Sequence, residues 1–251
     1  MGNYMNIKIS KGINLGDVDM LQFNSIPKIA HRTKSIPEMV SGKKVLSIGC
    51  VDMIDSMDIE TILSKDSHQF FNISKTASKL IGIDINSNGI SELIKMNLDA
   101  RYFDVFNDLP TGDLLEEFDY IVVSHVIEHI PDCYNFVKNI VIKFKFKKII
   151  IAVPNAFSPW NIKSAFMKRE IVSNDHYYTF SPLTLIKLVS SFNLKVLDLY
   201  FDQINEIWKP KIEIGKNRKI LGTINNIRKA LVWKVFDNSS GDIVLVAGKN
   251  D

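Results

Sequence analysis

From Lys43 onward, apolar runs of strand length alternate with stretches of helical period, and this alternation restricts the fold more than any other feature. The predicted strands lie at residues 44–49, 80–85, 100–103, 118–124, 148–153, 194–201 and 242–248. The predicted helices lie at residues 89–96, 133–146 and 182–192. Strands buried on both faces that alternate with amphipathic helices are typical of a parallel sheet covered by helices. The sequence therefore predicts an α/β fold.

The length of the chain indicates one domain with additions. A domain usually has about 100–200 residues, and this chain has 251, of which 46% are hydrophobic and 24% charged. Such a composition excludes a disordered chain. We expect residues 1–42 to form an N-terminal extension or cover and residues 43–251 to form the α/β domain. Residues 203–237 hold eight basic residues against three acidic ones, so we interpret them as a basic insertion before the final strand.

Charge, hydropathy and cysteine content restrict the partners and the compartment. The chain has 31 basic and 28 acidic residues and a net charge of +3. Nucleic-acid-binding proteins normally carry a larger and clustered basic excess, so we expect no nucleic-acid partner. No apolar run approaches the about 20 residues of a membrane span, so we expect no stable membrane insertion. Two cysteines without a paired pattern favour a reducing compartment and a cytoplasmic location. For the oligomeric state, the sequence is compatible with a monomer or a homodimer.

Ligands of an open parallel sheet bind beyond the carboxyl ends of its strands, so the residues that follow each strand are candidates for cofactor binding. These candidates are Ile48, Gly49, Cys50, Asp84, Ile85, Asp104, Val105, Ser124 and His125. Gly49 permits a tight turn close to a ligand. Asp84 is placed to accept hydrogen bonds from a ribose diol, and Asp104 from an adenine amino group. Capping and turn roles are the alternatives for these two aspartates.

A nicotinamide cofactor is disfavoured by the spacing of these residues. Asp84 follows Gly49 by 35 residues, whereas the dinucleotide-binding fingerprint places its acidic residue about 20 residues further on. The glycine pattern of that fingerprint is also missing, because Val51 stands at the position of its second glycine.

Two histidines and one glutamate are the candidates for catalysis. His129 follows the fourth predicted strand and His176 precedes the last predicted helix; either suits a general base near neutral pH, or a hydrogen-bonded loop position. Glu128 is a candidate to orient a histidine, to bind the amino group of a cofactor or to join a metal site. His125, Glu128 and His129 also form a His-x-x-Glu-His zinc motif. That motif needs a sustained helix, which Pro131 opposes, so we predict no metal site and disfavour a zinc hydrolase.

Five segments resemble class I S-adenosylmethionine-dependent methyltransferases. Residues 45–50 (Val-Leu-Ser-Ile-Gly-Cys) and 81–85 (Ile-Gly-Ile-Asp-Ile) resemble the first two motifs of that family. Residues 118–132 are similar to the Glu-His-containing segment of its small-molecule branch. Residues 152–157 resemble the end of its fifth strand, and residues 174–185 resemble the stretch before its last core helix. The five segments occur in the family's order and at the expected strand ends.

The resemblance implies a fold, a cofactor and a reaction. The fold is a Rossmann-like, doubly wound sheet of seven mostly parallel strands with an antiparallel last strand. The methyl donor is S-adenosyl-L-methionine, and the product is S-adenosyl-L-homocysteine. The acceptor is an oxygen atom of a small molecule or of a cell-surface glycan precursor, and the catalytic residues are His129, His176 and Glu128.

The chain departs from the family at three positions. Ser47 stands where an acidic residue is usual, and Val51 and Met53 stand where glycines are usual. The form Gly49-Cys50-Val51 resembles a branch associated with cell-surface polysaccharide clusters. The missing glycines keep a second hypothesis open, a methyltransferase-like domain that binds its ligand without turnover.

Overall fold

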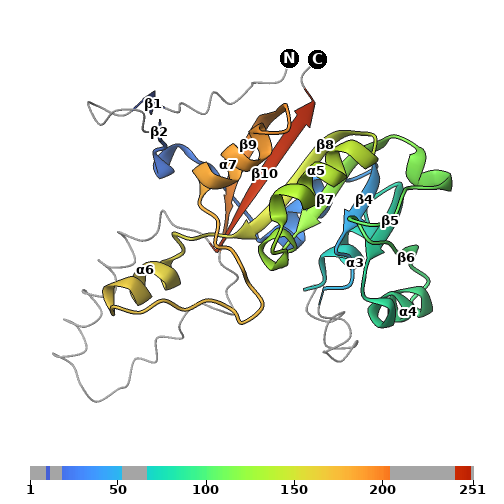
Figure 1. Ribbon diagram of the computed structural model, residues 1–251, viewed down its shortest axis with the longest axis horizontal. Helices are drawn as coiled ribbons and strands as arrows, with labels where there is room; N and C mark the ends of the chain where they lie inside the picture. Colours follow the sequence, from blue (N-terminus) through green and yellow to red (C-terminus); the bar gives the residue numbers. More distant parts are fainter. Residues whose placement is uncertain (1–9, 12–18, 53–66, 204–240, 250–251) are drawn as a thin grey trace.

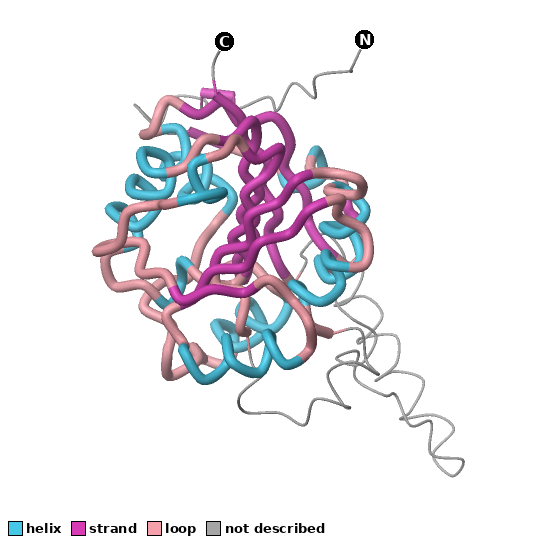
Figure 2. The backbone as a smooth tube through the Cα atoms, turned by 90° about the vertical axis from the view of Figure 1, so that its right-hand side faces the viewer, coloured by secondary structure: helices cyan, strands magenta, loops and turns pink. Residues whose placement is uncertain are grey.

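The predicted alternation of strands and helices folds into a twisted sheet of eight strands, covered by helices on both faces (Figure 1, Figure 2). The computed structural model describes residues 10–11, 19–52, 67–203 and 241–249. The sheet strands are β3 (Lys28–Ile29), β4 (Lys44–Ile48), β5 (Lys79–Asp84), β6 (Ala100–Tyr102), β7 (Phe118–Ser124), β8 (Phe146–Pro154), β9 (Leu194–Asp202) and β10 (Asp242–Lys249). Strands β1 (Ser10–Lys11) and β2 (Asp19–Met20) form a separate antiparallel pair.

The helices occur between these strands. They are α1 (Arg32–Met39), α3 (Gln69–Ser74), α4 (Ser87–Lys95), α5 (Cys133–Lys143), α6 (Pro159–Phe166) and α7 (Pro182–Ser190). Short 3-10 helices are η1 (Phe23–Ser25), η2 (Gly112–Leu115) and η3 (Ile127–His129). Among the described residues, no helix has the length and apolar character needed to cross a membrane.

The strand order β3-β9-β10-β8-β7-β4-β5-β6 confirms the predicted fold class. Strand β10 runs antiparallel to β8 and β9, and the other neighbouring pairs are parallel. The eighth strand is β3, which pairs with β9 through Lys28 and Phe201. Its two residues are too few to show a strand pattern in the sequence. The predicted basic insertion at 203–237 lies outside the described residues, apart from Gln203.

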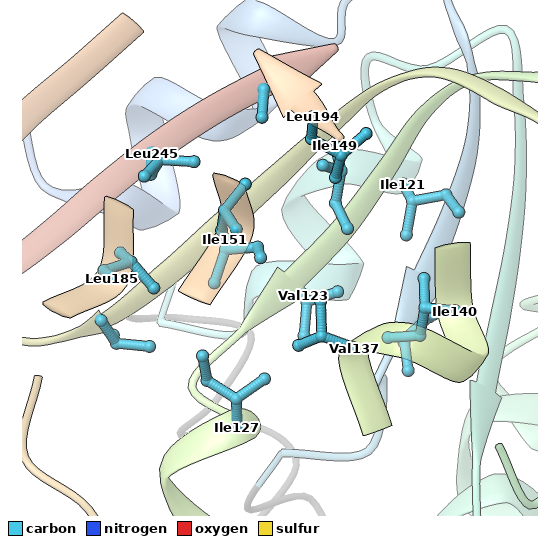
Figure 3. Packing of buried hydrophobic residues seen from close by; sticks show 14 of the residues in the cluster. Ile121, Val123, Ile127, Val137, Ile140, Ile149, Ile151, Leu185, Leu194 and Leu245 are labelled. Carbon is cyan, nitrogen blue, oxygen red and sulfur yellow. The ribbon is translucent and has the colours of Figure 1, made fainter. Parts of the chain in front are cut away.

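Each face of the sheet has its own core. Helices α5 and α7 cover one face, where residues such as Val137 and Leu185 pack against Val123 and Ile151 (Figure 3). Helices α1 and α3 contribute Ile36 and Ile73 to the core on the other face. The strands are therefore buried on both sides, which explains why their sequences are apolar runs rather than alternating patterns.

Two helix boundaries show how local sequence sets the fold. Helix α7 begins as predicted, because Ser181 and Thr184 form a capping box and Pro182 occupies the first turn. Helix α5 ends at Lys143, so the predicted end at Phe146 is wrong. Phe146 instead begins β8 and pairs with Phe118. Because Phe146 is buried where it pairs with Phe118, the contact between the two strands overrides the helical pattern.

The unusual Val51 is accommodated by a glycine in the neighbouring helix. Its side chain is 2% exposed and packs with Phe70 and Ile90. A Cβ atom on Gly89 of α4 would lie only 2.1 Å from Cγ1 of Val51. The bulk that replaces the family's usual glycine therefore points into the core under α4.

The first prediction tests this packing. Substitution Gly89→Ala should lower the free energy of unfolding by about 1–3 kcal/mol, because overpacking costs that much although alanine favours a helix by about 1 kcal/mol. In a Val51→Ala background the same substitution should cost less, because both Cγ atoms are gone and only the Cβ atom of residue 51, at 3.0 Å, stays close. Urea unfolding of the four proteins measures both effects. Ser91→Ala, at an exposed position of α4, serves as the control, and a G89A cost that is equal in both backgrounds contradicts the packing argument.

Candidate cofactor and acceptor site

The turn after β4 packs directly against the loop after β7. Gly49 has a φ of +74°, a region that favours glycine. Its amide donates a hydrogen bond to the Ile83 carbonyl at 2.9 Å. A Cβ atom on Gly49 would lie 2.2 Å from Cγ2 of Val126. The first predicted motif and the fourth strand's loop therefore meet at the carboxyl edge of the sheet, with no room for a side chain at Gly49.

Ile48 and Cys50, on either side of Gly49, direct their side chains into the protein. Both are buried, and burial raises the pKa of the Cys50 thiol far above its ordinary value. Cys50 therefore lacks the thiolate character of a nucleophile. What these two residues can present to a ligand is their backbone.

Asp84 lies at the carboxyl end of β5 and connects two turns. One carboxylate oxygen accepts the amide of Val51 at 3.1 Å, and the other accepts the amide of Asn86 at 3.0 Å. Each oxygen has a further lone pair for a ligand. The neighbouring Ile85 is 63% exposed, so this strand end offers both a carboxylate and an apolar surface.

Asp104 occupies a turn after β6. Its carboxylate accepts hydrogen bonds from the Phe106 amide at 2.8 Å and from Nδ2 of Asn107 at 2.7 Å. Val105 beside it is buried. These contacts are the turn interactions of an ordinary aspartate, so the alternative that the sequence left open for Asp104 has direct support.

Ser124 and His125 belong to a charged network centred on Arg32, which the sequence analysis missed. Nη1 of Arg32 donates to Oγ of Ser124 at 3.2 Å, and its Nε contacts Oδ2 of Asp242 at 3.2 Å. His125, with a φ of +56°, directs Nε2 to the same oxygen of Asp242 at 2.8 Å. Asp202 accepts the backbone amides of Arg32 and Asp242. The partners are distant in sequence, so no local signal pointed to Arg32.

The two buried aspartates of this network differ in protonation. Burial, and then the negative charge of Asp242, raise the pKa of Asp202 above its ordinary value. Burial also acts on Asp242, but His125 and Arg32 outweigh it and hold the pKa of Asp242 below its ordinary value. Near neutral pH the network therefore keeps the charge on Asp242, between two cationic or polar groups.

The three predicted catalytic residues come together on two segments. Glu128 and His129 lie on η3, and His176 lies on the segment before α7. The imidazole rings of His129 and His176 meet edge to face, with centroids 4.5 Å apart. The amide of Tyr177 donates to the carbonyl of Glu128 at 2.8 Å, and this bond holds the two segments together.

Burial alters the protonation of this group. Desolvation raises the pKa of Glu128 above its ordinary value, against the influence of His125. Burial and the neighbouring His129 lower the pKa of His176. His176 is therefore held towards its neutral form, which is the form that accepts a proton or a metal ion.

The His-x-x-Glu-His pattern does not present its histidines on one helix. The 3-10 helix η3 spans three residues, and His125 precedes it in a left-handed conformation. The ring of His125 is engaged with Asp242, whereas His129 contacts Asp175. A zinc helix of the hydrolase type is therefore not formed by these residues.

The second prediction concerns the Arg32 network. Arg32→Gln should lower the free energy of unfolding by about 3–5 kcal/mol at pH 8, because it leaves buried carboxylates without their cation. The depressed pKa of Asp242 contributes stability above its unfolded value, and this contribution is lost as pH falls through the folded value. In the parent protein this loss falls below pH 3.8. Without Arg32 the pKa of the buried Asp242 rises, so R32Q takes up this proton at a higher pH, and its cost should shrink as the pH is lowered from 8 through that raised value.

Urea unfolding at several pH values measures this cost. Arg101→Gln is the matched control, since Arg101 also contacts two carboxylates, Asp99 and Asp113, but is more exposed. It should cost about 1 kcal/mol or less. An equal cost for the two variants, or an R32Q cost that does not vary with pH, would show that the network does not stabilise the fold.

Comparisons with known proteins agree with the fold described above. The chain is similar to a S-adenosylmethionine-dependent methyltransferase from Archaeoglobus fulgidus at 19% identity and a TM-score of 0.50, covering 86% of this chain and 90% of that one. A magnesium protoporphyrin IX methyltransferase from Synechocystis PCC 6803, with bound S-adenosylhomocysteine, has 9% identity and a TM-score of 0.54 over 88% and 84% of the two chains. A putative methyltransferase from Bacillus halodurans has 13% identity and a TM-score of 0.52 over 87% and 99%.

These three similarities concern the fold, and a family model provides a match at the level of sequence. Among curated proteins, none matches this chain. The family described as a methyltransferase domain matches residues 26–199. The match covers more than half of the sequence, including β3, α1 and the strand ends described above. The chain therefore belongs to the methyltransferase domain family, and its cofactor is S-adenosyl-L-methionine.

Proposed function

We propose that this chain methylates an oxygen atom of a small molecule or of a cell-surface glycan precursor. The observation that carries the proposal is the convergence of Glu128, His129 and His176 at the carboxyl edge of the sheet. This edge is where ligands of open α/β sheets bind. Glu128 and His129 follow Val126, which packs against the Gly49 turn, so acceptor chemistry and cofactor binding would be neighbours.

The cofactor would be held by the strand ends from β4 to β7. The backbone of Ile48, Gly49 and Cys50 would face it, because the side chains of Ile48 and Cys50 are buried in the protein. The carboxylate of Asp84, with Ile85 beside it, would accept the ribose hydroxyls. The turn of Asp104 and Val105 would border the adenine. Ser124 and His125 would lie under the reacting end of the cofactor.

Methyl transfer requires little covalent chemistry from the protein. The acceptor oxygen forms a bond to the methyl carbon while the carbon–sulfur bond breaks in line, and the electron pair stays on sulfur. The protein must hold the oxygen in place and exclude water. The hydroxyl proton needs a recipient, and His176 is suited because it is held towards its neutral form. His129 and Glu128 would complete the surroundings of the oxygen.

The packing of Val51 counts against the hypothesis of a domain without turnover. That hypothesis rested on the missing glycines, but the Val51 side chain lies in the core against Gly89 and not above the Gly49 turn. We also infer that the methyltransferase domain begins before residue 43, because β3 and α1 pack onto the sheet. The basic insertion at 203–237 stays as proposed from the sequence.

The third prediction tests cofactor binding. The full chain should bind S-adenosyl-L-methionine in isothermal titration, and Asp84→Asn should weaken the affinity about 10- to 100-fold, because a hydrogen bond to a charged group contributes about 1.5–3 kcal/mol. Asp99→Asn, an exposed aspartate next to β6, should leave the affinity unchanged. Absence of binding at millimolar cofactor would reject the proposed function, and equal affinities for D84N and the parent protein would reject the role of Asp84.

The fourth prediction tests turnover. With hydroxylated small molecules and nucleotide sugars as acceptors, the parent protein should release S-adenosyl-L-homocysteine. His176→Ala should lower kcat about 10²- to 10⁴-fold, as expected for loss of a general base, without changing cofactor affinity. Deoxy analogues that lack the methylated hydroxyl should not react. Tight cofactor binding without product for any acceptor would favour the domain that binds without turnover.

A further inference from the structure

We propose that Glu128, His129 and His176 bind a divalent transition-metal ion, with Zn²⁺ as the first candidate. One ligand atom from each of the three side chains lies within 4.8 Å of the other two. Two ligands bonded to one ion at about 2.0–2.2 Å are at most about 4.4 Å apart, so small side-chain rotations bring all three onto a single ion. Two imidazoles and one carboxylate are a ligand set that such ions prefer. The inference rests on the proposed function, because it concerns the acceptor side of that same site.

The buried carboxylate of Glu128 is the strongest indication of a missing partner. The side chain is 0% exposed, and neither of its oxygens accepts a hydrogen bond from any residue that the structure describes. A buried polar atom without a partner costs free energy. The nearest basic group is Nδ1 of His125, 3.8 Å from Oε1, which exceeds hydrogen-bond distance. A cation bound by Glu128 would satisfy both oxygens.

His125 does not supply this partner because its ring is committed elsewhere. Nε2 of His125 lies 2.8 Å from Oδ2 of Asp242. If the neutral ring carries its proton on Nε2, as this contact favours, Nδ1 has no hydrogen to give to Glu128. The Arg32 network therefore leaves the Glu128 carboxylate available to a ligand.

The histidines have the surroundings of metal ligands. Nδ1 of His129 lies 3.1 Å from Oδ2 of Asp175, which leaves Nε2 of His129 for an ion. A carboxylate behind a ligating imidazole orients the ring and strengthens it as a ligand. His176 is half-buried and meets the His129 ring edge to face, so both rings are positioned before an ion arrives.

A second cluster of similar composition is a poor metal site. His31, Asp202 and Asp242 also bring their ligand atoms within 4.8 Å of one another. There, however, the guanidinium of Arg32 contacts Asp242 at 3.2 Å, and two backbone amides donate to Asp202. The carboxylates are already satisfied, and the cation of Arg32 opposes a second one. This cluster therefore supplies the matched control for the proposed site.

A bound ion would change how the acceptor is activated. With three protein ligands, Zn²⁺ keeps a position open, where an acceptor hydroxyl could bind and lose its proton to water more readily. The oxygen would then take the methyl group as described above, and the two histidines would act as ligands rather than as bases. The acceptor class that fits is a hydroxylated molecule able to bind through oxygen.

The test measures metal binding without reference to activity. Metal-free full-length protein is titrated with Zn²⁺ alone by calorimetry, and with Co²⁺ alone by visible absorption, which reports the coordination of the ion. We expect one Zn²⁺ per chain and Co²⁺ absorption bands typical of a nitrogen- and oxygen-ligated site. Glu128→Gln and His176→Ala should each weaken binding more than about 100-fold. Asp175→Asn should weaken it about 10- to 100-fold, as expected for a residue behind a ligand. His31→Gln should change nothing.

Several outcomes would overturn the inference. These are no binding of either ion at millimolar concentration, binding that survives both E128Q and H176A, and binding that is lost equally in H31Q. Circular dichroism and cofactor titration of each variant show whether it is folded, and since His176 is half-buried, H176A keeps the test valid if E128Q fails to fold. Methyl transfer that persists undiminished in metal-free protein would overturn the metal site while leaving the proposed function intact. Failure to bind S-adenosyl-L-methionine would reject the proposed function while leaving the metal site intact.

Discussion

The burial of the Asp242 carboxylate between Arg32 and His125 is the interaction on which the site depends. It connects helix α1, the end of β7 and the beginning of β10. A buried charge is tolerated only when it is paired and hydrogen-bonded, so the three elements must stay in register at this edge. The same contact occupies Nε2 of His125, while Nδ1 of that ring lies 3.8 Å from Oε1 of Glu128.

Most of the fold could be predicted, because strands that are buried on both faces have continuous apolar sequences. The central runs of β7 and β8, residues 121–123 and 149–153, consist of apolar residues that are buried in the sheet. The prediction failed where pairing outweighs local pattern. Phe146 was expected at the end of helix α5 but pairs with Phe118 in the sheet, and β3 is too short to show any period.

The candidate site was predictable in part, for a related physical reason. Chain direction alone brings the residues after parallel strands to one edge, so Gly49, Asp84 and the loop with Glu128 could be placed from the sequence. Chain direction does not determine which side chains pack together. The pairing of Val51 with Gly89, and the salt bridge from Arg32 to a residue 210 positions away, depend on contacts between segments that no local pattern relates.

The antiparallel direction of β10 has a consequence for how such a domain can diversify. Strand β9 ends at Asp202 and β10 begins at Asp242, and the two strands pair from Ile243 and Phe201 onward. Both ends of the intervening chain therefore leave the sheet at its carboxyl edge. Chain can be lengthened, shortened or replaced there without unpairing a strand, since loop closure costs rise only slowly with length. Selection can thus add or remove chain at the carboxyl edge through this one connection, while the paired strands are inherited unchanged.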